Sequence, residues 1–152
     1  MIIRQARIED CESIYAMLRR YKDASPLKAH QYMNEETAKQ AVQFIIEKRH
    51  GLILLSEDND EITGMIMALY TMNIWDQKIK YMQELAYWVE PEHRGTTAGY
   101  RLLSKYAEIG DQLMALDVIQ YFTISKMVTS PDLDYTRFGF EYLEETHICQ
   151  AV

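Results

Sequence analysis

A turn rich in small residues carries the clearest chemistry in the sequence. An apolar run ends at Val89, and after Pro91 comes Arg94-Gly95-Thr96-Thr97-Ala98-Gly99, where a helical pattern starts at once. Small residues let the backbone approach a ligand closely, and the start of a helix leaves several N–H groups unpaired. These amides and the helix dipole attract anions. The stretch therefore predicts an anion site, most simply one for phosphate.

The turn does not match the familiar nucleotide loops. A Walker loop needs a lysine and then Ser or Thr after its second glycine, whereas Gly99 is followed by Tyr100-Arg101. The dinucleotide fingerprint GxGxxG is absent as well. A net charge of −7 also counts against duplex nucleic acid as the main partner, because binding a phosphate backbone needs a basic surface.

A second motif, Tyr135-Thr136-Arg137-Phe138-Gly139-Phe140, lies about forty residues beyond the turn. Together the two motifs resemble the GCN5-related N-acetyltransferase (GNAT) superfamily. In that family a strand ending V-x-P leads into an R/Q-x-x-G-x-G/A turn, and a Y-x-K/R-x-G-F element follows near the C-terminus. Arg94 and Gly99 match the first and last turn positions. Thr97 replaces a usual glycine, so the turn must accept an ordinary helical conformation there.

The resemblance implies an enzyme that moves an acetyl group from acetyl-CoA to a primary amine by direct attack in a ternary complex, without a metal. It implies that the CoA pyrophosphate lies on the turn. It also implies that the pantetheine arm pairs with the preceding strand, where that strand and the next one splay apart. The cofactor-binding residues expected on this basis are Trp88, Val89, Arg94, Gly95, Thr96, Thr97, Ala98, Gly99 and Tyr100.

Two residues are candidates for the proton transfers. An amine attacks only when neutral, so a group must accept its proton. Glu84, in the apolar run before the turn, is the candidate base, and the family often uses a glutamate in this region. The resemblance gives Tyr135 the role of protonating the CoA thiolate. The alternative interpretations are a solvent-facing Glu84 and a Tyr135 that packs against the last strand.

The acceptor and the class of activity stay open at this point. Residues 22–34 and 71–80, the latter with Trp75, are the loops most suited to contact an amine, and their charges are mixed. Polyamines, aminoglycosides, amino acids, protein N-termini, lysines and modified nucleobases are all compatible with them. Two other classes are a GNAT-like module that binds acyl-CoA without turnover and a protein that acts only by binding a macromolecule. Because members of the family are often dimers, a homodimer is an option too.

Length and composition fit one ordinary domain over residues 1–152. No segment approaches the ~18 consecutive apolar residues of a membrane span, and Arg4 and Arg7 interrupt any secretory signal, so we expect a cytoplasmic protein. Cys11 and Cys149 lie far apart in the chain and are expected to be buried or half-buried thiols rather than a disulfide. The four scattered histidines give no metal-binding pattern.

The elements that must position these residues follow from hydrophobic periodicity. We expect strands at 1–7, 52–57, 62–72, 80–89, 117–124 and 140–150, and helices after Asp10, after Asn34 and after the turn. A short helix or turn is expected near 130–138. The order β-α-α-β-β-β-α-β-α-β is that of the GNAT family, and the fold class is α/β (α+β), with a mixed, mostly antiparallel central sheet flanked by helices.

Overall fold

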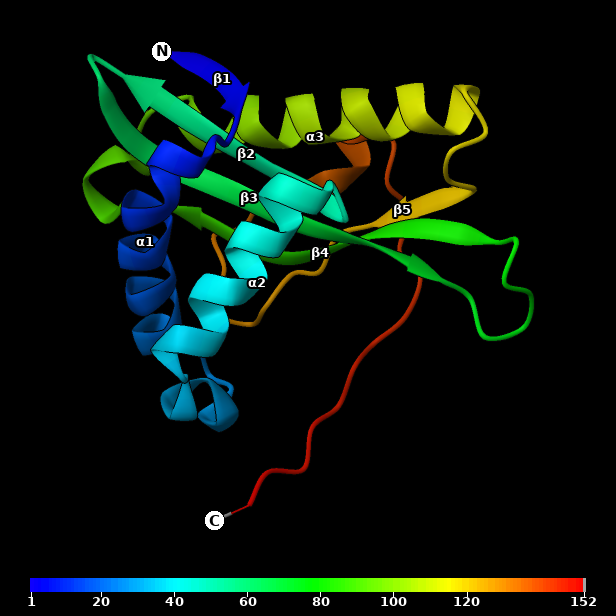
Figure 1. Ribbon diagram of the computed structural model, residues 1–152, viewed down its shortest axis with the longest axis horizontal. Coiled ribbons are helices and arrows are strands. Elements are labelled where there is room, and N and C mark those ends of the chain that lie inside the picture. The colour runs from blue at the N-terminus through cyan, green and yellow to red at the C-terminus, as the bar shows by residue number, and fades with distance from the viewer. Residues whose placement is uncertain (152) are drawn as a thin grey trace.

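The structure of the chain, a computed structural model, describes residues 1–151 (Figure 1). It contains five strands, three α-helices and four short 3-10 helices. The strands are β1 (Ile2–Gln5), β2 (Gly51–Asp58), β3 (Glu61–Met72), β4 (Lys80–Val89) and β5 (Tyr121–Thr123). The α-helices are α1 (Cys11–Ala24), α2 (Glu35–Lys48) and α3 (Ala98–Ala115). The 3-10 helices are η1 (Ile8–Asp10), η2 (Lys28–Tyr32), η3 (Pro91–His93) and η4 (Tyr135–Phe138).

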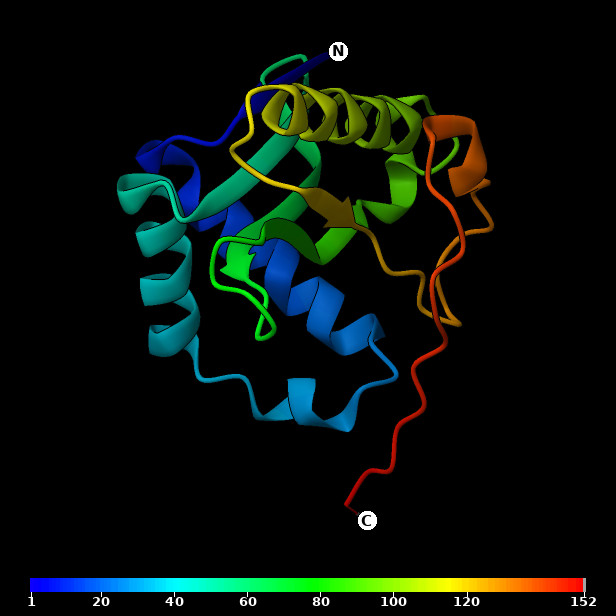
Figure 2. The ribbon, with the colours of Figure 1, turned by 90° about the vertical axis from the view of Figure 1, so that its right-hand side faces the viewer.

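The strands form one sheet in the order β1-β2-β3-β4-β5. The first four pair antiparallel, and β4 pairs with β5 in parallel. In Figures 1 and 2, α3 covers one face of this sheet, and α1 and α2 cover the other. The predicted fold class, a mixed and mostly antiparallel sheet flanked by helices, is therefore confirmed.

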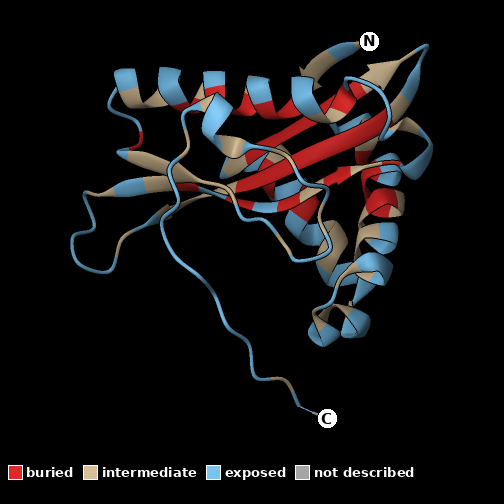
Figure 3. Ribbon diagram, turned by 180° about the vertical axis from the view of Figure 1, so that it is seen from behind, coloured by how far each residue is buried: buried red, intermediate tan, exposed pale blue. Residues whose placement is uncertain are grey.

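Each face of the sheet has its own apolar core. Helices α1 and α2 pack Ile14, Met17 and Ile45 against the first face, and α3 packs Leu102 and Tyr106 against the second. The central strands β2 and β3 carry most of the buried sheet residues, whereas the C-terminal segment and the β3–β4 loop are exposed (Figure 3). The two cores fix how β4 sits between α1 and α3.

Local capping explains where α2 begins and ends. As predicted, Asn34 is its N-cap: the side-chain oxygen accepts a hydrogen bond from the Thr37 amide at 2.9 Å. The helix ends when Arg49 adopts a left-handed conformation with φ 54°. Gly51 is the first residue of β2.

A β-bulge in β4 decides which side chains face which helix. Ala68 on β3 pairs with Glu84 and the adjacent Met67 pairs with Ala86, so Leu85 has no partner on β3. Before the bulge, even-numbered Met82 packs in the core beneath α3. After it, even-numbered Trp88 packs in the core beneath α1. A strict two-residue alternation along β4 would assign Met82 and Trp88 to the same face of the sheet, whereas they lie on opposite faces.

The C-terminal part of the chain differs from the prediction. Strand β5 covers only Tyr121–Thr123, and the expected helix near 130–138 is the single 3-10 turn η4. The strand expected at 140–150 does not form: these residues are extended, unpaired and mostly exposed. The apolar residues there are interrupted by the polar run 144–147, and no neighbouring strand pairs with the segment. Cys149 is exposed, and Cys11, as expected, is buried.

Helix α3 packs very closely on β5 at Gly110. A Cβ built at this residue would lie 2.5 Å from two ring carbons of Phe122. Alanine normally favours a helix over glycine by about 1 kcal/mol, so Gly110→Ala would stabilise the protein if there were room. We expect it instead to lower the free energy of unfolding by about 1–3 kcal/mol. Urea denaturation measures this, with Asp111→Ala on the exposed side of the same helix as control, and a gain in stability would contradict the packing.

Candidate functional site

A cavity opens where four segments of the chain meet. They are the C-terminal end of α1, the last residues of β4, the turn before α3, and the loop between β5 and η4. Its lining residues are Tyr21, Ala24, Ser25, Tyr87, Trp88, Val89, Arg94, Thr96, Gly99, Tyr100, Met127, Thr129, Ser130, Pro131, Leu133 and Tyr135. The cavity therefore brings together both motifs that the sequence analysis singled out.

The turn before α3 presents free backbone donors, as predicted. Within residues 1–151, the amides of Gly95, Thr97, Gly99 and Tyr100 have no hydrogen-bond acceptor. The Thr96 side chain organises the turn: its hydroxyl donates to the His93 carbonyl at 2.7 Å and accepts from the Ala98 amide at 3.2 Å. Free amides at the start of an eighteen-residue helix are suited to an anionic group.

The threonine at position 97 fits the turn without strain. Thr97 is the N-cap of α3, with φ −81° and ψ 3°, so the residue needs no positive φ. Its hydroxyl does not cap the helix and lies 3.9 Å from the Met1 sulfur. This negative φ is the ordinary conformation that the sequence analysis expected of the turn, because a threonine replaces the family's usual glycine here.

Arg94 folds back onto the end of β4. Its Nε donates to the Val89 carbonyl at 3.0 Å, and its guanidinium carbon lies 4.6 Å from the Trp88 ring centroid. Trp88 in turn donates from Nε1 to the buried Glu90 carboxylate at 3.2 Å. Arg94 thus places a positive charge on the cavity wall, next to the free amides of the turn.

Gly99 allows β4 and α3 to approach each other. The Tyr87 hydroxyl donates to the Gly99 carbonyl at 2.7 Å, and a Cβ on Gly99 would lie 2.9 Å from that hydroxyl oxygen.

Gly99→Ala is expected to cost about 1–2 kcal/mol of unfolding free energy, because it breaks this hydrogen bond. In a Tyr87→Phe protein the hydroxyl that the new methyl group would meet is already absent, so Gly99→Ala should cost less unfolding free energy there than in the wild-type protein. Urea denaturation of Gly99→Ala in both backgrounds measures this difference. Equal costs in the two would contradict the contact, and Gly95→Ala, with nothing within 4 Å, is the control for stability.

Strands β4 and β5 diverge at Glu84. They pair only from Tyr81–Tyr121 to Gln83–Thr123, and beyond this point Leu85–Val89 has no partner on β5. The Glu84 carboxylate lies at the point of divergence, where its Oε2 accepts from the Ser125 amide at 3.2 Å. Burial raises the pKa of Glu84 to about 7, and the Ser125 hydrogen bond limits the rise. Glu84 is therefore buried, not solvent-facing, and both of its protonation states are accessible near neutral pH.

Tyr135 lines the cavity from η4. Asp134 caps this short helix by accepting from the Thr136 amide at 3.0 Å, and Gly139 ends it with φ 86°. Burial, and secondarily the charge of Glu84, raise the pKa of Tyr135 to about 12. The Tyr135 hydroxyl has no hydrogen-bond partner among the described residues. It therefore remains protonated at neutral pH and is free to donate into the cavity.

A family comparison assigns the chain to a known group of enzymes. The model of the acetyltransferase (GNAT) family matches residues 11–140, which is most of the chain. The chain belongs to the GNAT acetyltransferase family. The resemblance drawn from the turn and the Tyr135 motif is thereby confirmed. None of the curated proteins matches the chain.

Solved structures share the fold of this GNAT protein. A GNAT family acetyltransferase of Staphylococcus aureus has 21% identity and a TM-score of 0.65, with 99% of this chain and 98% of the other covered. A protein of Clostridium difficile described as a possible acetyltransferase has 17% identity, a TM-score of 0.70 and coverages of 99% and 97%. A Clostridium acetobutylicum protein, described as a predicted acetyltransferase with acetyl-CoA, has 12% identity, a TM-score of 0.69 and coverages of 98% and 95%.

Tyr21 is a cavity residue that the sequence analysis missed. Its apolar spacing on α1 indicated a packing role, and the ring does pack edge-on against Trp88, with centroids 6.2 Å apart. Its hydroxyl, however, lies 3.8 Å from the Met127 sulfur, in the loop after β5. Burial, and secondarily the charge of Glu84, raise the pKa of Tyr21 to about 12. The charge of Glu84 thus contributes to the raised pKa of both Tyr21 and Tyr135.

Only one of the two loops expected to contact an acceptor borders the cavity. Ala24 and Ser25, from the stretch 22–34, line it. No residue of 71–80 does: these residues form the projecting β3–β4 connection, in which Trp75 is 86% exposed. None of the α-helices within residues 1–151 is long and apolar enough to cross a membrane.

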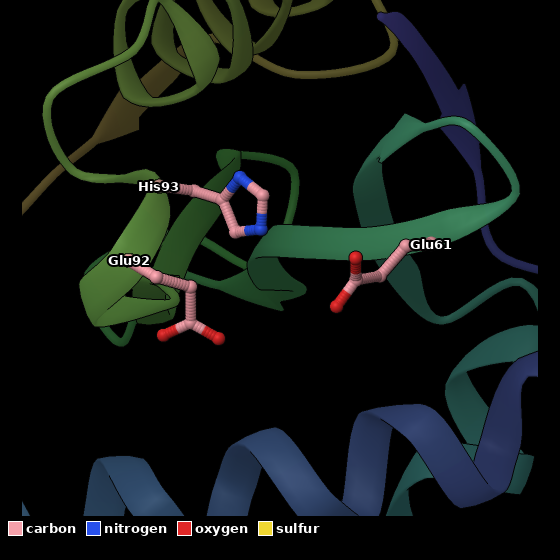
Figure 4. Close-up of side chains that lie close together, drawn as sticks. All are labelled: Glu61, Glu92 and His93. Carbon is pink, nitrogen blue, oxygen red and sulfur yellow. The ribbon is translucent and has the colours of Figure 1, made fainter.

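One other cluster of side chains could hold a cation. Glu61 at the start of β3 and Glu92 and His93 on η3 place one ligand atom each within 4.8 Å of the others (Figure 4). Both carboxylates are exposed. The group lies outside the cavity lining, and the described residues leave no buried side-chain polar atom without a hydrogen-bond partner. It therefore adds nothing to the chemistry of the site.

Proposed function

We propose that this GNAT protein transfers the acetyl group of acetyl-CoA to an amine by direct attack in a ternary complex. One observation carries the proposal: a single cavity joins free helix-start amides to Tyr135, at the point where β4 and β5 diverge around Glu84. An anion site alone would suit many phosphate ligands. The unpaired edge of β4 beside it suits a long, amide-containing arm, which can hydrogen bond to a strand.

The residues present fit such a ligand in two parts. The pyrophosphate would bind the free amides of Gly95, Thr97, Gly99 and Tyr100, with Arg94 adding positive charge beside them. The pantetheine arm would follow the edge of β4 from Val89 towards Glu84. This edge has no strand partner on the β5 side, so its backbone groups are available, apart from the Val89 carbonyl that accepts from Arg94.

Glu84 is suited to accept the proton of the amine. A typical alkylamine has a pKa of roughly 10, so it first gives up one proton to solvent to become the neutral nucleophile. As it attacks the thioester carbonyl carbon, its nitrogen must lose a second proton to become an amide, and this is the proton that Glu84 would accept. A carboxyl with a pKa of about 7 is ionised in part at neutral pH and still has useful basicity. Glu84 is not part of the cavity surface, so the proton would reach it through a water molecule.

Tyr135 is suited to protonate the leaving group. As the C–N bond forms and the tetrahedral intermediate collapses, the C–S bond breaks and the sulfur leaves as a thiolate. The Tyr135 hydroxyl, which is protonated and unpartnered, would donate its proton to that sulfur. Solvent then returns a proton to the tyrosine and takes up the proton that Glu84 received.

An assay of free thiol tests the proposal. Purified protein with acetyl-CoA should release CoA thiol much faster when an acceptor amine is present, and mass spectrometry should find the acetylated amine. Heat-unfolded protein is the control for uncatalysed aminolysis. If the folded protein binds acetyl-CoA but gives no amine-dependent thiol with any amine, the protein is an acyl-CoA-binding module and the transferase proposal is wrong.

A further inference from the structure

The end of the cavity near α1 is lined mainly by aromatic and apolar side chains. This acceptor end is formed by Tyr21, Ala24 and Ser25 of the α1 terminus together with Trp88 and Met127. Trp88 separates it from the anion site, because Tyr21 meets one side of its ring system and the Arg94 guanidinium lies over its face. Assigning this end to the acceptor rests on the proposed function.

Two tyrosines fix the acceptor end relative to the reacting centre. The Glu84 carboxylate accepts from the Ser125 amide, two residues before Met127, and the Met127 sulfur lies 3.8 Å from the Tyr21 hydroxyl, so one loop links Glu84 to Tyr21. The charge of Glu84 contributes to the raised pKa of both Tyr21 and Tyr135. Tyr135 is the proposed proton donor to the leaving sulfur. An amine approaching the thioester from the other side would therefore pass Tyr21 and Met127, whose side chains touch across the cavity.

The acceptor end offers an amine almost no negative charge. No Asp or Glu lines the cavity within residues 1–151, and Arg94 is its only charged lining residue. The buried Glu90 lies just behind Trp88, but its carboxylate is already paired: it accepts from Arg20 Nε at 3.0 Å and from Trp88 Nε1 at 3.2 Å. Among the described residues, the cavity lining thus offers no carboxylate to pair with an incoming ammonium group, and Glu84 lies behind the lining.

We infer that the acceptor is a singly charged primary amine that carries an aromatic or aliphatic group close to its nitrogen. Tyr21, Trp88 and Met127 offer rings and a thioether to such a group. A polyamine or an aminoglycoside would bring several ammonium groups to a wall that carries a guanidinium and no free carboxylate. Desolvating those charges without partners is unfavourable.

A panel of amines tests this class and separates its two sources. We would measure kcat/KM by thiol release with 2-phenylethylamine, with a short peptide whose N-terminal residue is phenylalanine, with spermidine and with kanamycin. The first two share the inferred chemistry, and their ratio tells whether the source is a free amine or a peptide. The better of them should exceed spermidine and kanamycin by about tenfold or more.

A charge placed in the acceptor end should change this preference. Met127→Glu adds a carboxylate beside Tyr21 and should lower the phenylethylamine-to-spermidine ratio about tenfold. Val128→Glu is the matched control: it adds the same charge one residue further on, at a side chain that is 94% exposed and outside the cavity lining. It should leave the ratio unchanged. Calorimetric binding of acetyl-CoA to each variant shows that the site is still folded.

Several results would overturn the inference. Spermidine or kanamycin preferred by wild-type protein, no turnover of either apolar amine, or the same ratio in Met127→Glu and Val128→Glu would each exclude the inferred class. If the protein still binds acetyl-CoA and acetylates some amine, these results reject the acceptor class but not the proposed transferase function. Absence of acetyl-CoA binding to the wild-type protein would instead reject the proposed function itself, and the acceptor class with it.

Discussion

Tyr135→Phe is expected to lower kcat by about two to three orders of magnitude, with little change in the affinity for acetyl-CoA. The substitution removes the hydroxyl of a residue that lines the cavity, and it keeps the ring. The ring packs against Phe140, with centroids 6.3 Å apart, so phenylalanine should preserve the packing. Steady-state kinetics at saturating acetyl-CoA measure kcat, and calorimetry measures the affinity.

Tyr142→Phe is the matched control, because it deletes the same hydroxyl from a side chain that is 77% exposed. Its kcat should equal that of the wild-type protein. If Tyr135→Phe also keeps its kcat, then Tyr135 is only a packing residue and another group must protonate the thiolate. If acetyl-CoA affinity falls in parallel with kcat, the hydroxyl serves binding and not proton transfer.

Glu84→Gln is expected to lower kcat/KM at neutral pH by about a hundredfold. The informative measurement is the pH profile with an amine of pKa below about 6, such as a fluorinated alkylamine, because this amine stays neutral throughout. Wild-type kcat/KM should then rise with pH and level off above about 7, as Glu84 loses its proton. The variant should lack this rise, and Glu144→Gln, at an exposed position, should retain it.

Stability measurements distinguish a lost base from a damaged fold. The pKa of Glu84 is about 7 in the folded protein and 4.5 ordinarily, so folding favours its protonated form. The resulting stabilisation is complete below pH 4.5 and is lost as the pH rises through 7. The total is on the order of 3 kcal/mol.

Glutamine stays neutral and can still accept from the Ser125 amide. Urea denaturation should therefore find Glu84→Gln more stable than the wild-type protein at pH 8 and similar to it at pH 4. A variant that is less stable at pH 8 would show that its loss of activity comes from the fold. A kcat/KM profile that still rises near pH 7 in the variant would exclude Glu84 as the base.

Sequence alone predicted most of the fold because its patterns are local. The start of α2 after Asn34, the presence of a strand over 80–89 and the apolar repeat of α3 are each decided within a few residues, and all three recur in the structure. The turn could be predicted for the same reason. Its small residues and the helix that follows are adjacent in the chain, and the free amides are a property of any helix start.

Other features depend on contacts between distant segments. The bulge at Leu85 changes the alternation of β4 and places Trp88 beneath α1. No pattern in the sequence of the strand predicts this bulge. From the sequence, Tyr21 is an ordinary packing residue of a helix, and its place in the cavity depends on the loop after β5, which brings Met127 next to it. The strand expected at 140–150 does not form because a strand needs a neighbouring strand to pair with, and sequence spacing does not provide one.

The central claim is that the cavity binds acetyl-CoA, and titration calorimetry of the purified protein with acetyl-CoA tests it most directly. We expect one site with a dissociation constant on the order of 1–100 μM, equivalent to roughly 5.5–8 kcal/mol. ATP and NAD, which offer phosphates but no pantetheine arm for the free edge of β4, should not bind comparably. Equal binding of all three would mean that the turn is a general phosphate site. No binding of acetyl-CoA would contradict the account.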